Sequence, residues 1–116
     1  MSLSTNVTSA GDAVTVAFAG ELDISRADEV ERELERIEGE GPTTLVFDLR
    51  GLDFLDSTGL RLILGADSRA RRDGRRVVIV PGPEAVHRVF RITLLDQRLE
   101  FAESPEAVAA EGDAHA

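Results

Sequence analysis

Apolar residues along this chain follow two different spacings, and the spacing separates expected strands from expected helices. Near the N-terminus, Val14, Val16 and Phe18 alternate with small residues, which is typical of a strand with one buried face. Residues 5–8 predict a weaker first strand, and Ser-Ala-Gly-Asp at positions 9–12 is typical of a turn. Because so short a link joins neighbouring strands, the sequence predicts an N-terminal antiparallel hairpin.

Later segments repeat apolar residues every three or four positions, which is the period of an α-helix. A first helix is expected to begin near Ser25, because Ser25 and Asp28 resemble a capping box, and to end at Gly39 or Gly41. A second is expected over residues 57–72, a third from Pro83, and a fourth after Ser104-Pro105. The expected inner faces are Ala27, Val30, Leu34 and Ile37, then Gly59, Ile63, Ala66 and Ala70, then Val86, Val89, Phe90 and Leu94.

Three short apolar runs complete the pattern. Residues 44–49 and 76–80 predict parallel strands buried on both faces, and residues 99–102 predict a short last strand. The fold class is therefore α/β, with a single mixed, mostly parallel sheet of four to five strands, an N-terminal antiparallel hairpin and about four helices. We expect one domain over residues 1–110 and a disordered tail over residues 111–116.

Composition excludes several kinds of chemistry. The chain has 116 residues, no cysteine, and 13 basic residues that are all arginine. Without cysteine or lysine it cannot use a thiol nucleophile, a Schiff base or a phosphate-binding loop. Neither His87 nor His115 has a second ligand at metal spacing, so no metal, no cofactor and no enzymatic activity are expected.

Net charge and hydropathy narrow the expected partners and location. A net charge of −9 argues against nucleic acid, although Arg69, Arg71, Arg72, Arg75 and Arg76 form one basic cluster. We interpret that cluster as a solvated helix end, where cations complement the helix dipole. Residues 1–5 lack both a basic region and an apolar run, and no apolar stretch approaches the length needed to cross a membrane, so we expect no signal peptide and a cytoplasmic location.

Asp48 is one candidate for phosphorylation, because an aspartate at a strand end is the acceptor in receiver domains. Such a site also needs a lysine after the last strand, and this chain has none. We therefore favour a structural role in which the carboxylate receives backbone N–H bonds.

The stretch Asp56-Ser57-Thr58-Gly59 is the second candidate. The simplest interpretation is a helix N-cap, in which Ser or Asp accepts an N–H bond from the first turn. Gly59 makes a functional role more plausible than a simple helix cap. Glycine inside a helix costs about 1 kcal/mol relative to alanine, so its presence indicates a close backbone approach. A small hydroxyl at an exposed helix start is also accessible to a kinase.

At these residues the chain resembles the STAS domain family, and within it the stand-alone anti-sigma factor antagonists. The resemblance rests on Gly20-Glu21-Leu22-Asp23, on Val46-Phe47-Asp48-Leu49 followed by Leu52 to Leu60, and on the segments 77–80 and 86–90. It covers essentially the whole chain.

The resemblance implies a partner-switching mechanism. An unphosphorylated antagonist binds an anti-sigma factor that is also a serine kinase of the histidine-kinase-like ATPase type, and this binding releases the sigma factor. Phosphorylation of the residue matching Ser57 switches binding off, and a PP2C-type phosphatase restores it. Thr58 is a minor candidate acceptor. The residues that match the family's contact surface are Asp23, Asp56, Ser57, Thr58, Gly59 and Leu60.

A second function stays open at this point. The chain could be a constitutive STAS assembly or scaffold subunit of a stress-sensing or transport complex, with Ser57 acting only as a helix cap. Phosphate at Ser57 in cells would favour the first function, and elution with large partners would favour the second.

Overall fold

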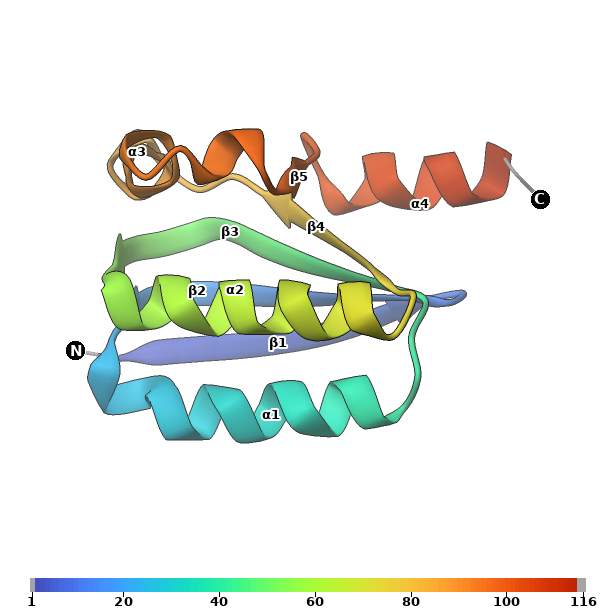
Figure 1. The fold of residues 1–116 in the computed structure, drawn as a ribbon, viewed down its shortest axis with the longest axis horizontal. Coiled ribbons are helices and arrows are strands. Elements are labelled where there is room, and N and C mark those ends of the chain that lie inside the picture. The colour runs from blue at the N-terminus through green and yellow to red at the C-terminus, as the bar shows by residue number, and fades with distance from the viewer. Residues whose placement is uncertain (1, 115–116) are drawn as a thin grey trace.

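The computed structural model describes residues 2–114, which form a five-stranded sheet with four α-helices and two 3₁₀ helices. The sheet order is β1-β2-β3-β4-β5, with β1 antiparallel to β2 and every later pair parallel (Figure 1). The expected fold class is confirmed. The strands are β1 (Leu3–Ala10), β2 (Ala13–Leu22), β3 (Thr44–Leu55), β4 (Arg76–Val80) and β5 (Glu100–Phe101).

The hairpin forms as expected, but both of its strands are longer than the alternation indicated. Ala10 pairs with Ala13, so only Gly11 and Asp12 make the turn, and Gly11 takes a φ of 62° that glycine adopts without strain. Strand β2 continues to Leu22, beyond Phe18, where the predicted alternation ends. Its register against β3 shifts twice, between Ala17 and Ala19 and again between Gly20 and Glu21, so the added part of the strand pairs irregularly.

Strand β3 is the centre of the sheet and positions the candidate site. It runs twelve residues to Leu55, so Asp48 lies inside the strand and not at its end. Residues 45–49 are all buried, as expected for a strand covered on both faces. Side chains alternate between faces, so Leu45, Phe47 and Leu49 point into the main core and Val46 and Asp48 point to the opposite face.

The main core lies between the sheet and the helices α1 (Ala27–Gly39), α2 (Ser57–Arg72) and α3 (Glu84–Ile92). Helices α1 and α2 lie side by side (Figure 1). Of the predicted inner face of α1, Val30, Leu34 and Ile37 are buried, while all four predicted residues of α2 are buried. The opposite face of the sheet carries a smaller cluster of Val46, Val78 and Val80, which Val108 of α4 (Pro105–Ala114) covers.

Several helix ends differ from the expectations. Helix α1 begins at Ala27 without a side-chain cap, so the capping box of Ser25 and Asp28 is wrong; Asp23 instead caps the short 3₁₀ helix η1 (Ile24–Arg26). Pro83 is the N-cap of α3 and not its first helical residue. Leu94 is 60 % exposed beyond the end of α3 and precedes the 3₁₀ helix η2 (Leu95–Gln97), so its place on the inner face is wrong.

The last helix agrees with the sequence at its start and differs at its end. Ser104 caps α4 through a 3.1 Å bond from the Ala107 N–H, as expected. The helix continues to Ala114, so residues 111–114, expected in a disordered tail, are helical. The final two residues of that expected tail, His115 included, lie outside the described part of the chain.

Candidate functional site

Two aspartates mark the end of the sheet where the candidate site lies. Asp23 follows β2 directly and Asp56 follows β3 directly, and Leu22 pairs with Leu55 in the sheet. A 3.4 Å bond from the Asp56 N–H to the Leu22 carbonyl ties the two strand ends together. Helix α2 begins at this end of the molecule, at the left of Figure 1. Sheet pairing thus brings together residues that are 33 positions apart in the sequence.

Each aspartate caps the helix that follows it. The Asp23 carboxylate accepts bonds from the Ser25 N–H at 3.0 Å and from the Ser25 hydroxyl at 2.6 Å. The bond from the Ser25 hydroxyl is the main reason that the pKa of Asp23 lies below its usual range. The Asp56 carboxylate accepts the Gly59 N–H at 2.9 Å, which closes the first turn of α2.

Ser57 is the first residue of α2 and is exposed. The interpretation of this stretch as a helix N-cap is confirmed for Asp56, which accepts the bond, and is wrong for Ser57. Within the described residues, the Ser57 hydroxyl makes no hydrogen bond to the protein. The hydroxyl therefore faces solvent without a structural task, as a modification site requires.

The neighbours of Ser57 divide into surface and core positions. Thr58 is half-buried, whereas Gly59 and Leu60 are buried. A Cβ on Gly59 would lie 2.6 Å from Leu55 Cδ1 and 2.8 Å from the Leu22 carbonyl oxygen. The expected close backbone approach at Gly59 therefore exists, and the surface it approaches is the domain's own core at the strand ends.

Two exposed apolar residues next to these aspartates were missed by sequence reasoning. Ile24 is 74 % exposed immediately after Asp23, and Phe54 is 48 % exposed two residues before Asp56. Both would lose water contact on docking, which is favourable for binding a partner. The sequence pattern gave no signal for Phe54, because strict alternation would place it on the same face as buried Leu52.

Asp48, the other candidate acceptor, is occupied by an ion pair. Its carboxylate accepts the Arg50 N–H at 3.1 Å and two guanidinium bonds from the same residue at 2.9 and 2.8 Å. Burial works against the charged carboxylate, but the bonds and charge of Arg50 outweigh it and hold the pKa of Asp48 below its usual range. The favoured structural role is thus confirmed by the bond from the Arg50 backbone N–H, and the Arg50 guanidinium is an additional partner.

The basic cluster after α2 is likewise committed to carboxylates. Arg69 binds Glu38 of α1 with two bonds of 2.7 and 2.9 Å, and Arg71 binds Asp67. Arg72 and Arg75 contact Asp73, and Arg76 contacts Glu100. The side chains of Arg71 and Arg72 remain largely exposed, as expected of a solvated helix end, and the carboxylate contacts leave little free positive surface there.

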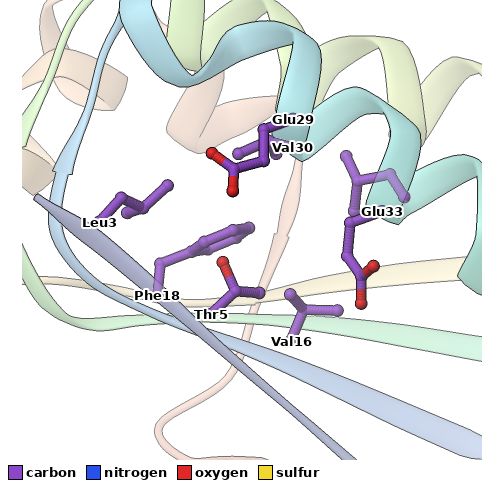
Figure 2. A pocket seen from close by; sticks show the side chains of 8 residues that line it. Leu3, Thr5, Val16, Phe18, Glu29, Val30 and Glu33 are labelled. Atoms are coloured by element: carbon purple, nitrogen blue, oxygen red, sulfur yellow. The ribbon is translucent and has the colours of Figure 1, made fainter.

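A separate hollow of about 270 Å³ lies between α1 and the hairpin (Figure 2). Val16 and Phe18 form part of its lining, and Glu29 and Glu33 project from α1 at its edge. Glu29 is paired with Arg26 and Glu33 with Arg36, so both carboxylates already have partners. None of the candidate site residues lines this hollow.

The sequence of this domain matches a known protein family over most of its length. The family model described as STAS domain matches residues 4–108. The chain belongs to the STAS domain family.

Across the described residues, no group of three or more His, Asp or Glu is placed to hold a metal, and no helix is both long and apolar enough to cross a membrane.

Known STAS proteins resemble this domain over nearly its whole length. An anti-sigma-B factor antagonist of Staphylococcus aureus is 26 % identical over 106 residues, which are 91 % of this chain and 98 % of that protein. The crystal structure of an anti-sigma factor antagonist from Mycobacterium paratuberculosis has a TM-score of 0.81 at 24 % identity and covers 95 % of this chain and 93 % of its own. The unphosphorylated anti-sigma factor antagonist SpoIIAA has a TM-score of 0.79 at 22 % identity, with coverage of 94 % and 97 %.

Proposed function

We propose that this STAS domain is an anti-sigma factor antagonist controlled by phosphorylation of Ser57. In its unmodified form it binds an anti-sigma factor that is a serine kinase of the histidine-kinase-like ATPase type, and binding releases the sigma factor. The kinase phosphorylates Ser57 and thereby ends the contact, and a PP2C-type phosphatase reverses the step. The domain acts in the cytoplasm as a binding module and not as an enzyme.

One observation carries the proposal: Ser57 is exposed at the start of α2, while a neighbouring residue, Asp56, caps the helix. A serine that capped the helix would resist modification, because its oxygen would be engaged with a backbone N–H. The names of the relatives support the same function, and SpoIIAA has also been solved in a phosphorylated form, with a TM-score of 0.73 at 21 % identity, over 92 % of this chain and 98 % of its own.

The contact surface that we propose surrounds this hydroxyl. Asp23, Asp56 and Thr58 supply polar groups, and the exposed Ile24 and Phe54 supply apolar area. Gly59 and Leu60 shape the surface from beneath, because both are buried. A phosphate adds about −1.5 to −2 charges among carboxylates that are already negative, so it opposes the partner without damaging the fold.

A modest loss of binding free energy on phosphorylation is sufficient for a switch. A micromolar complex corresponds to about 8 kcal/mol of binding free energy. A penalty of about 3 kcal/mol weakens it by roughly 150-fold, which releases the partner at micromolar concentrations.

The test is a paired capture experiment from a lysate of the source organism, with proteins identified by mass spectrometry. Wild type and Ser57→Ala should both retain a kinase of the stated type, and Ser57→Asp should lose it. Ser68→Asp is the matched control, because Ser68 is exposed on the same helix away from the site. Retention of the same partner by Ser57→Asp and wild type would contradict the switch and favour a constitutive scaffold subunit.

A further inference from the structure

The residue one helical turn after Ser57 is an arginine. Ser57 and Arg61 are four positions apart on α2, and both are exposed. Residues at this spacing lie on the same face of a helix, about 6 Å apart at their Cβ atoms. Helical side chains tend to lean toward the N-terminus, so a side chain as long as that of Arg61 can reach back over the first turn to Ser57.

The other groups around Ser57 do not favour a phosphate. Asp53 and Asp56 both precede it in the sequence, and Asp23 lies at the end of the paired strand. The Asp56 carboxylate also takes the Gly59 N–H at 2.9 Å, so one amide that would stabilise an anion at this helix start is already occupied. A cation nearby would therefore stabilise a phosphate on Ser57 among these carboxylates.

Arg61 is available for that purpose, in contrast to the arginines further along the helix. Arg69, Arg71 and Arg72 bind Glu38, Asp67 and Asp73. Among the described residues, Arg61 takes part in no ion pair. It lines a hollow of about 370 Å³ between α1 and α2, together with Thr58 and Glu31. Glu31 is the acidic group of α1 that a phosphate would compete with.

We propose that Arg61 binds the phosphate of phosphorylated Ser57, as an intramolecular pair across the first turn of α2. This inference rests on the proposed phosphorylation of Ser57. The guanidinium offers paired N–H donors that match phosphate oxygens, and a negative group N-terminal to a cation at this spacing is the favourable order. Phosphorylation then changes the partner surface twice, because it adds an anion and withdraws the Arg61 cation.

The experiment measures the pH titration of the phosphate itself in the 116-residue chain. Phosphoserine is installed at position 57 during synthesis, so no kinase is needed. Titration of the phosphate is followed by ³¹P NMR in the wild-type background and in Arg61→Gln. A neighbouring cation favours the doubly charged phosphate, so its removal should raise the titration midpoint by roughly half a pH unit. Arg61→Lys keeps the charge and should restore most of the difference.

Arg98→Gln is the matched control. Arg98 is also exposed, and its carbonyl accepts a 3.0 Å bond from Arg71, which places it at the opposite end of α2. The Arg98→Gln substitution removes the same charge and should leave the titration midpoint of the phosphate as in wild type. Equal midpoints in Arg61→Gln and wild type, with the fold verified by circular dichroism, would overturn the inference. Partner capture by the phosphorylated wild-type protein would instead contradict the proposed switch and leave the titration result standing.

Discussion

At the scale of single residues, the site depends on a division of tasks between neighbours. Asp56 accepts the Gly59 N–H and so satisfies the start of α2, which leaves the Ser57 hydroxyl exposed. A sequence pattern with two adjacent capping residues cannot say which of them takes the bond, because both Asp and Ser are good N-caps. The backbone decides here: Asp56 is extended, with φ of −104° and ψ of −175°, as an N-cap requires.

This division predicts a clear difference between two alanine variants. Asp56→Ala removes the cap and should lower the free energy of unfolding by about 1 kcal/mol. Ser57→Ala removes an exposed hydroxyl and should change it by less than about 0.5 kcal/mol. Urea denaturation of both variants measures the difference. A larger loss for Ser57→Ala than for Asp56→Ala would show that the serine is the cap after all.

Gly59 allows a second test, with a control on the same helix. Gly59→Ala gains helix propensity but places a methyl group 2.8 Å from the Leu22 carbonyl oxygen and 2.6 Å from Leu55 Cδ1. Overpacking against a fixed backbone atom should dominate and lower the free energy of unfolding by about 1–3 kcal/mol. In Gly65→Ala the new methyl meets only the flexible end of Arg69, at 3.2 Å. That variant should be stabilised by up to about 1 kcal/mol, so thermal melting of the pair should shift in opposite directions.

At the scale of elements, the sequence predicted types well and several ends poorly. The second helix was predicted from Ser57 to Arg72 and is found there, because Asp56 and Asp73-Gly74 mark its limits clearly. Strand β3 was predicted to stop at Leu49 and continues to Leu55. The charged residues Arg50 and Asp53 and the glycine at position 51 hid this extension, since only pairing with β2 makes this segment part of a strand.

The candidate site shows the same limit. Sequence reasoning proposed the segment from Asp56 to Leu60, because its residues are contiguous and match a family pattern. Ile24 and Phe54 were missed, since their exposure follows from where the paired strands end and not from their own types. Gly59 was expected to serve a close approach, but the pattern could not say to what; the packing of Leu22 and Leu55 answers this.

Strand β3 also carries a pH dependence that can be measured. Burial opposes the charge of Asp48, but its bonds to Arg50 hold the pKa below the unfolded value of about 4. A carboxylate with a lowered pKa stabilises the fold fully above that value, and the contribution is lost as pH falls through the folded pKa.

Asp48→Asn should therefore cost about 1 kcal/mol near neutral pH, since its partner Arg50 is half-exposed and screened. The difference from wild type should stay constant down to about pH 5 and shrink below about pH 4. Urea denaturation across that range provides the measurement. A difference that does not change with pH would mean that the ion pair makes no net contribution.

At the scale of the whole molecule, the two faces of the sheet are covered unequally. Three helices bury one face, whereas the other has a small cluster of Val46, Val78 and Val80 under Val108 of α4. Asp48 lies on this second face as well, and the charge of Glu106 on α4 acts on Arg50 across it. The last helix therefore closes the domain on the face opposite α1 and α2.

Charge placed at Val108 should undock this helix. Val108 is 4 % exposed, so Val108→Asp buries an unpaired carboxylate against three valines and should lower the free energy of unfolding by about 2–4 kcal/mol. Ala107→Asp adds the same charge at a half-buried neighbouring position and should cost less. Amide hydrogen exchange distinguishes undocking of α4 alone from destabilisation of the whole domain. If α4 undocks alone, protection should fall at Val78 and Val80 before it falls at Ile63 in α2, which packs on the other face of the sheet. If protection falls equally on both faces, α4 is part of the cooperative core and not a separately docked helix.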